Sequence, residues 1–219
     1  MDDRPAATET PAPPARRPAP LVRFAVWAFA GVIVFTLLWT RVSPWLSYPI
    51  AALTHATLEQ VTPMWIHTAH KRPGSIEVET TVEVALPQAA GRRAEVTLEA
   101  DPGRYAFGLP IFLALLAAAW AAGRAPGRWQ RALLGYVLLL PVQSFSLTMY
   151  LLMQLAGAAR FDLRALRIDQ WQLEAIIFGY QLGVLVLPTL APVLVWLLLD
   201  RRFFTSVIVR GWQKSLQPR

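Results

Sequence analysis

The chain has 219 residues, a formal net charge of +7 and no cysteine. Without cysteine it can form no disulfide, use no thiolate nucleophile and offer no thiolate to a metal. Apolar residues make up 55% of the chain and charged residues only 16%, which is typical of a membrane protein, so the basic residues are expected to meet anionic lipid headgroups and not nucleic acid.

Residues 1–20 contain six prolines and few apolar side chains. Such a segment cannot bury enough apolar surface to offset the entropy lost on ordering. We therefore expect a disordered, Pro-rich cytoplasmic tail. The apolar stretch that follows has no small-x-small cleavage pattern after it, so we expect it to remain as an anchor and not to be removed as a signal peptide.

Four apolar stretches are each long enough to cross a bilayer. At ~1.5 Å per residue they would reach roughly 27 to 40 Å, against a hydrocarbon layer of ~30 Å. The predicted fold is a mainly α membrane protein, a four-transmembrane-helix bundle with a small extracytoplasmic α+β insertion between the first two spans. The expected divisions are the tail at 1–20, spans at 21–40, 105–123, 132–156 and 173–199, extracytoplasmic segments at 41–104 and 157–172, a cytoplasmic loop at 124–131 and a basic cytoplasmic tail at 200–219.

The distribution of basic residues predicts the orientation. Twelve of the 21 lysines and arginines lie in residues 1–23, in the 124–131 loop and from Arg201 onward. Because cytoplasmic segments carry an excess of basic residues, both termini are predicted to be cytoplasmic. The three arginines of the 160–167 loop oppose this orientation, since they lie on the other side.

The first half of the 41–104 insertion has the pattern of a helix. Apolar residues recur at helical spacing from Ile50 to Val61. Ser47 or Tyr48 can cap the start, and Thr62-Pro63 ends the pattern.

The second half has the pattern of a β-hairpin. Residues 76–86 alternate between apolar and polar side chains, 87–93 read as a turn, and 95–100 alternate again. A lone hairpin is only marginally stable in water. It is therefore expected to pack on the preceding helix, on the membrane surface or on another protein.

Titratable residues of the insertion offer weak candidates for chemistry. Its glutamates fall on the polar face of the hairpin, which a solvated face already explains; they are Glu77, Glu79, Glu83, Glu95 and Glu99. His67 and His70 could share a helical face, but they lack the spacing of known zinc signatures. No metal, cofactor or catalytic site is therefore predicted. A membrane-embedded hydrolase that uses one of these histidines with an outer serine or glutamate stays an alternative.

The spans carry prolines, glycines and amides, and none has an ionisable residue at its middle. This argues against an ion-coupled transporter. Prolines remove backbone donors, and nearby amides and hydroxyls can bind the freed carbonyl groups. Gly179 and Gly183 form a small-xxx-small face that permits close helix packing, within the chain or with a partner. A small transporter or lipid-handling protein, with a polar cavity around Gln143 and Gln181, stays an alternative.

Two short amphipathic stretches are expected to lie in the membrane interface, at 160–171 and 201–212. In both, arginines would face outward and aromatic or leucine side chains inward.

Three segments resemble exosortase H-associated membrane proteins. They are Asp101-Pro102-Gly103-Arg104-Tyr105-Ala106-Phe107-Gly108-Leu109-Pro110, Leu140-Pro141-Val142-Gln143, and Gly179-Tyr180-Gln181-Leu182-Gly183 continuing through Leu187-Pro188-Thr189-Leu190-Ala191-Pro192. The resemblance implies a small multi-pass protein of the bacterial inner membrane that accompanies an exosortase, a membrane enzyme that processes proteins with a C-terminal sorting signal.

Exosortases themselves look like cysteine-dependent enzymes, so this chain cannot be one. The resemblance implies instead a non-catalytic accessory protein that binds or positions the exosortase or the membrane-spanning tail of its substrate. The residues expected to form the contact, first as packing determinants and then as partner contacts, are Tyr105, Gly108, Pro110, Pro141, Gln143, Tyr180, Gln181, Gly183, Pro188 and Pro192.

Overall fold

The computed structural model describes residues 20–85, 93–123 and 127–201. The elements in chain order are α1 (Pro20–Leu46), α2 (Tyr48–Val61), β1 (Ile66–Arg72), β2 (Ser75–Ala85), β3 (Arg93–Ala100), α3 (Pro102–Tyr105), α4 (Gly108–Gly123), α5 (Arg128–Ala158), α6 (Leu163–Leu166), α7 (Gln170–Tyr180), the π-helix η1 (Gln181–Val186) and α8 (Leu187–Leu199). The expected N-terminal tail, nearly all of the 87–93 turn and nearly all of the 201–212 stretch lie outside the described residues.

Three stretches of the described chain are helical, long and apolar enough to cross a membrane. They are Val22–Leu46, Trp129–Ala158 and Gln170–Leu199. Helix α4 is as apolar but has only 16 residues, or ~24 Å. The chain is therefore a mainly helical membrane protein with several apolar helices, three of which are candidate spans.

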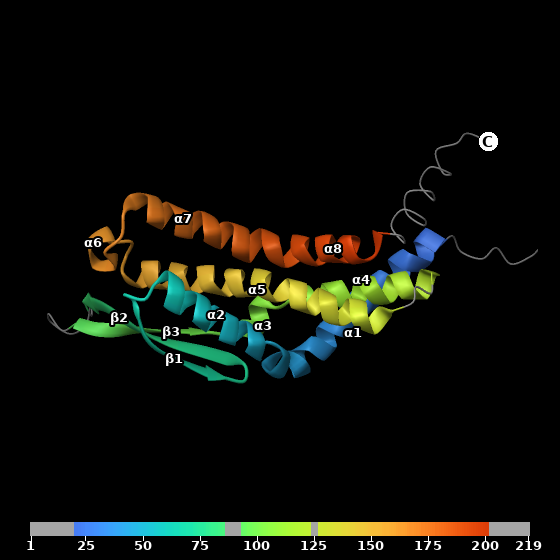
Figure 1. Cartoon of the computed structure of the whole chain (residues 1–219), viewed down its shortest axis with the longest axis horizontal. Helices are drawn as coiled ribbons and strands as arrows, with labels where there is room; N and C mark the ends of the chain where they lie inside the picture. Colours follow the sequence, from blue (N-terminus) through green and yellow to red (C-terminus); the bar gives the residue numbers. More distant parts are fainter. Residues whose placement is uncertain (1–19, 86–92, 124–126, 202–219) are drawn as a thin grey trace, which may run out of the picture.

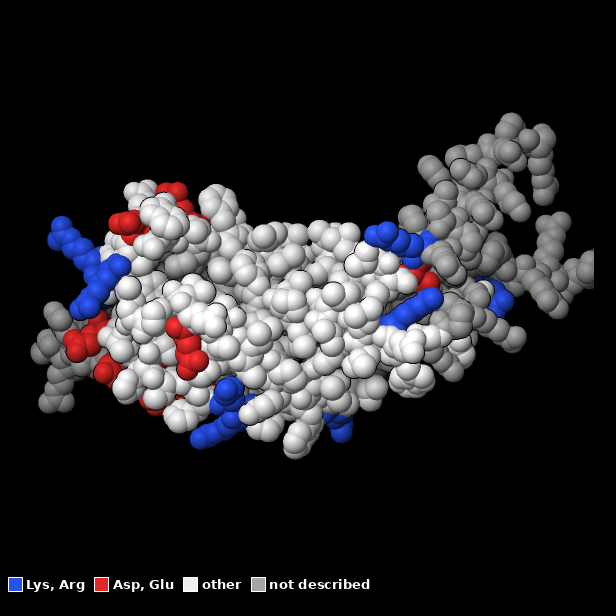
Figure 2. Space-filling model, in the orientation of Figure 1, with Lys and Arg blue, Asp and Glu red and all other residues white. Residues whose placement is uncertain are grey.

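The helices form an elongated bundle (Figure 1). Helix α5 runs along the length of the bundle beside the continuous run formed by α7, η1 and α8. Helices α1 and α4 lie toward one end of the bundle, and α2 and the sheet lie toward the other. Figure 2 shows that charged side chains gather mainly toward the two ends of the visible face, with a largely uncharged band between them. This distribution suits a protein whose middle lies in lipid.

Small residues set the helix contacts within the bundle. Gly31 of α1 faces Ala114 of α4, where an added Cβ would lie 3.2 Å from the alanine Cβ. Gly135 of α5 lies under Phe112 of α4, which is fully buried. Helix α1 packs mainly against α4, and few of its side chains are buried. Close packing of small residues is the usual way in which membrane helices associate.

The sheet is antiparallel and has the order β1-β2-β3. Ile76, Val78, Thr80 and Val82 of β2 face inward and are buried, while the alternate residues face outward. The inner face packs over α2 and α5. The predicted antiparallel pairing of the two alternating segments is confirmed, and the packing that a lone hairpin needs comes from the chain's own helices.

Strand β1 was missed by the sequence analysis, which considered a helical face for His67 and His70. The structure corrects this: both histidines lie on a strand that pairs with β2, with His70 opposite Glu77. The register shifts between Ile66 and Thr68. Such an irregularity breaks the two-residue alternation by which a strand is recognised.

Helix ends follow local residue chemistry. Helix α2 begins after Ser47 with a proline in its first turn and ends before Thr62-Pro63, as predicted. Asp169 and Gln172 form a capping box at the start of α7. The expected amphipathic stretch at 160–171 contains the short helix α6 and the first two residues of α7, and Arg160 and Arg167, on either side of α6, have positive φ.

Candidate functional site: the helix junction at residues 101–110

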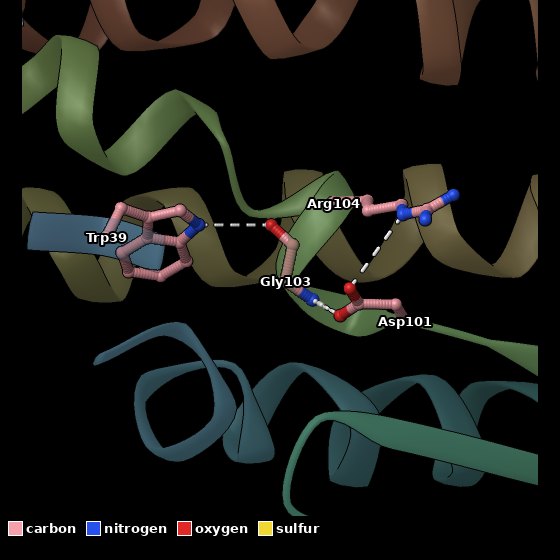
Figure 3. A network of polar contacts seen from close by, with 4 residues as sticks. All are labelled: Trp39, Asp101, Gly103 and Arg104. Carbon is pink, nitrogen blue, oxygen red and sulfur yellow. Dashed lines mark hydrogen bonds and ion pairs between the residues drawn. The ribbon is translucent and has the colours of Figure 1, made fainter. Parts of the chain in front are cut away.

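The segment from Asp101 to Pro110 joins the sheet to α4 and starts with a capped turn. Asp101 Oδ1 accepts a hydrogen bond from Gly103 N at 2.8 Å, and Pro102 takes the first helical position of α3. The other carboxylate oxygen lies 3.8 Å from Arg104 Nε. Figure 3 shows the Arg104 side chain extending away from the turn, and 82% of that side chain is exposed.

Helix α1 is tied to this turn by Trp39. The buried indole donates from Nε1 to the Gly103 carbonyl at 3.2 Å (Figure 3). Gly103 leaves little room for a side chain, since an added Cβ would lie 2.9 Å from Ser43 Oγ. The indole and the glycine thus hold the end of α1 against the start of α3.

Helix α5 contacts the same segment through two polar side chains, those of Gln143 and Tyr150. Gln143, which is 4% exposed, donates from Nε2 to the Ala106 carbonyl at 3.3 Å. The rings of Tyr105 and Tyr150 lie 4.8 Å apart, and Gln154 donates to the Tyr150 hydroxyl at 2.7 Å. These contacts involve neutral groups only.

Helix α8 completes the junction through Gly108 at the start of α4. A Cβ at Gly108 would lie 2.7 Å from Pro192 Cγ and 3.1 Å from the Pro188 carbonyl oxygen. Farther along, Gly183 of η1 lies against Ser146 and Phe145 of α5. Two glycines and two prolines of the predicted contact set therefore lie in close contacts between helices: Gly108, Gly183, Pro188 and Pro192.

The structure brings together part of the predicted set and separates the rest. Seven of its residues lie buried or half-buried where α3, α4, α5, η1 and α8 meet: Tyr105, Gly108, Pro110, Gln143, Gly183, Pro188 and Pro192. Tyr180 is half-buried at the end of α7 and lies close enough to Tyr105 to interact with it electrostatically, whereas Pro141 and Gln181 are exposed. Because Gln143 is buried and Gln181 is exposed, the two amides do not share one enclosed cavity.

The sequence analysis missed several residues of the junction. Trp39 was not among the predicted contact residues, although its indole is 7% exposed and bonded within the chain. Tyr150 and Gln154 lie one helical turn apart on α5, a spacing that could have indicated a shared face. Thr54 and Ser144 also meet, with their hydroxyl oxygens 3.2 Å apart, and nothing in the sequence pairs them.

Glutamates on neighbouring strands of the sheet lie opposite one another. Glu77 is directly opposite Glu99, and Glu83 is opposite Glu95. Across the described residues, no group of three or more His, Asp or Glu side chains is placed to hold a metal ion. The glutamates lie on the outward face of the sheet, as expected of a solvated surface.

A known protein family matches the part of the chain that contains the junction. The family model of the exosortase H-associated membrane proteins matches residues 18–203, which include all three membrane-length helices, the sheet and the whole junction. Searches of the curated proteins and of the solved structures find no match. Since the match covers most of the chain, the chain belongs to the family of exosortase H-associated membrane proteins.

Proposed function

We propose that the chain is a non-catalytic accessory protein that binds an exosortase in the bacterial inner membrane and holds it, or the membrane-spanning tail of its substrate, in place. The observation that carries this proposal is that the residues of the 101–110 junction connect helices to one another through packing and hydrogen bonds. Gly108 and Gln143 make neutral packing and hydrogen-bonding contacts between helices. Such contacts build a rigid frame and offer no nucleophile or acid-base pair.

The hydrogen bonds that fix α2 and the sheet to the helical bundle support the proposal that the chain positions its partner. Trp65, at the end of the loop after α2, donates from Nε1 to the carbonyl of Leu166, the last residue of α6, at 2.8 Å. Thr54 of α2 bonds Ser144 of α5. The sheet and α2 are thus fixed to the long α5 helix, so a partner bound on the membrane side would be held at a defined distance from the sheet.

The proposal includes four crossings, with both termini in the cytoplasm. Arg23, Arg131 and Arg201 belong to one end of the bundle, where Arg23 donates to the Ala121 carbonyl and Arg131 pairs with Asp200. The sheet lies toward the other end (Figure 1). Helix α4 would cross as the shortest span, with a modest tilt or local thinning of the bilayer.

Co-purification tests the binding. The chain carries an affinity tag and is expressed with the exosortase of the same genome, and the two are extracted in mild detergent. We expect the exosortase to elute with the tagged chain, and not with an unrelated tagged membrane protein of similar size.

Reconstitution tests the non-catalytic role. The purified chain, alone in vesicles with a sorting substrate, is expected to leave the substrate intact, whereas vesicles with the exosortase process it. Cleavage or transfer by the chain alone would overturn the proposal.

A further inference from the structure

The turn between β1 and β2 lies against the end of α1. The two strands pair as far as Arg72 opposite Ser75. Pro73 and Gly74 therefore form a two-residue turn, in which Gly74 has a φ of +86° that glycine adopts without strain. A Cβ at Gly74 would lie 3.6 Å from the Pro44 Cβ of α1. The tip of this hairpin thus contacts the last turn of the first candidate span (Figure 1).

The same part of α1 marks a membrane boundary. Arg23 and Arg41 are the charged residues nearest the middle of the helix, and they are 18 positions apart, or ~27 Å. The hydrocarbon layer is ~30 Å thick, so the two guanidinium groups can reach its opposite surfaces. Trp45 is 73% exposed and Tyr48 is 45% exposed, and such aromatic rings are typical of the membrane–water interface. The hairpin tip is therefore at the level of the lipid headgroups.

Three basic side chains surround this contact, and we call Arg41, Lys71 and Arg72 the hairpin-tip cations. Lys71 and Arg72 are neighbours at the end of β1, so they point to opposite faces of the hairpin. Arg41 lies about one helical turn before Pro44. Arg41 and Arg72 are exposed, and Lys71 is half-buried. Figure 2 shows basic side chains along the lower edge of the visible face, where the β1–β2 turn and the end of α1 lie in Figure 1.

None of the hairpin-tip cations has a hydrogen bond or an ion pair with another described residue. Other basic residues do bond within the chain: Arg23 donates to the Ala121 carbonyl, and Arg131 pairs with Asp200. No aspartate or glutamate occurs in residues 10–58 or 60–76. Acidic neighbours along the chain therefore do not neutralise these three charges.

We infer that the hairpin-tip cations bind the phosphate groups of anionic phospholipids in the leaflet on the sheet side of the membrane. Phosphate oxygens accept hydrogen bonds from guanidinium and ammonium groups and neutralise their charge. Basic residues next to a membrane span attract anionic lipids in this way. The bound lipid holds the tip of the sheet on the membrane surface, and this site does not depend on binding of an exosortase.

Quenching by labelled lipids tests the site in a bilayer. The natural chain has no cysteine, so the only dye is carried by Thr40→Cys, at an exposed position next to Arg41. The full chain is reconstituted in vesicles of phosphatidylcholine with a small fraction of phosphatidylglycerol, and one lipid or the other carries a nitroxide on its acyl chain. We expect labelled phosphatidylglycerol to associate with the dye position at least about fivefold more strongly than labelled phosphatidylcholine, the effect of one basic residue at a membrane surface.

Charge variants assign this preference to the three residues. Lys71→Gln with Arg72→Gln, and Arg41→Gln alone, should each reduce the preference for phosphatidylglycerol at least about threefold. The control is Arg164→Gln with Arg167→Gln, which removes two exposed arginines from the α6 end of the bundle (Figure 1) and should leave the preference unchanged. Lys71→Arg with Arg72→Lys keeps both charges and should also leave it unchanged.

Several results would overturn the lipid site. They are equal quenching by the two lipids in the wild-type chain, an equal loss from the α6 control pair, or a loss in the pair that keeps both charges. A loss from the Lys71 and Arg72 pair without a loss from Arg41→Gln would show that the three cations do not act at one place. Removal of the preference by millimolar inorganic phosphate would show that the cations bind a free anion and not a lipid. Melting curves in detergent establish that each variant is folded.

Discussion

Gly108 lies where α4 approaches α8 too closely for a side chain. Its added Cβ would lie 2.7 Å from a proline ring, and a proline cannot swing away as a flexible side chain can. We therefore expect Gly108→Ala to destabilise the protein by ~1–3 kcal/mol, the usual effect of overpacking a filled core. The measurement is the apparent melting temperature in detergent.

Gly157→Ala is the matched control for this substitution. Gly157 is also helical, but nothing lies within 4 Å of its added Cβ. Alanine there should stabilise α5 by up to ~1 kcal/mol, because it restricts the unfolded backbone more than glycine does. Equal effects at the two positions would mean that Gly108 is not a packing determinant.

Trp39 contributes both a ring and a hydrogen bond, and the two can be separated. Trp39→Phe keeps an aromatic ring but leaves the Gly103 carbonyl without its indole donor. The expected loss is ~1–2 kcal/mol of unfolding free energy, since the carbonyl lies in a buried turn. Trp27→Phe on the same helix is the control, because Trp27 is exposed, and it should change the melting temperature little. A similar loss in both variants would assign the effect to ring size.

At the scale of the elements, hydropathy predicted the long apolar helices, helical spacing predicted α2, and alternation predicted two of the three strands. The apolar stretch at 132–156 is helical, within Arg128–Ala158, and the hairpin appears as β2 and β3. These succeed because lipid-facing helices and a half-buried sheet impose simple periods on the sequence. The bulge in β1 and the π-turn in η1 break those periods, so neither could be recognised from periodicity.

The candidate site was predictable in its residue types but not in its geometry. Glycines and prolines in apolar stretches indicate close packing, and Gly108 and Pro192 do meet. Which glycine faces which helix depends on helix crossing, which the sequence does not encode locally. For that reason Gly183 could not be assigned to the interior, nor Gln181 to the surface, before the structure was known.

The Arg131 and Asp200 pair joins the start of α5 to the end of α8. Their side chains lie 2.8 Å apart, and that of Asp200 is 3% exposed. Arg131→Leu leaves a buried carboxylate without its cation, which should destabilise the fold by ~3–5 kcal/mol at neutral pH. The double variant with Asp200→Leu removes both charges and should recover most of this loss. A chemical unfolding curve for each variant measures the difference.

The pH dependence of the single variant provides an independent check. Burial raises the pKa of the Asp200 carboxyl, and Arg131 opposes that rise. Without Arg131 the pKa rises further, so the folded state binds a proton more tightly than the unfolded state does. The Arg131→Leu variant is then most stable relative to its unfolded state at low pH, where Asp200 is protonated. This stability is lost as the pH rises through the pKa that Asp200 has in the folded variant. The deficit of Arg131→Leu should therefore shrink as the pH falls below neutral, while the double variant should show no such recovery.

At the scale of the whole molecule, α4 decides how the chain is threaded through the membrane. Among the described residues between the sheet and α5, it is the only helix of membrane-compatible hydropathy. If α4 crosses, the sheet and the start of α5 are on opposite sides. If it does not, they are on the same side, and the chain has three crossings. With ~24 Å of helix against ~30 Å of hydrocarbon, crossing requires only a small adaptation of the bilayer.

Single cysteines can decide between these arrangements, because the natural chain has none and gives no background labelling. Three exposed residues are replaced by cysteine, one variant at a time. Thr97 lies on the outward face of β3, Gln130 lies at the start of α5, and Arg201 lies just after the end of α8. We expect a membrane-impermeant maleimide to label Thr97→Cys in intact spheroplasts, and the other two only after lysis. Labelling of both Thr97→Cys and Gln130→Cys before lysis would show that α4 does not cross, and the sheet and the α5 start would then have to share one aqueous phase.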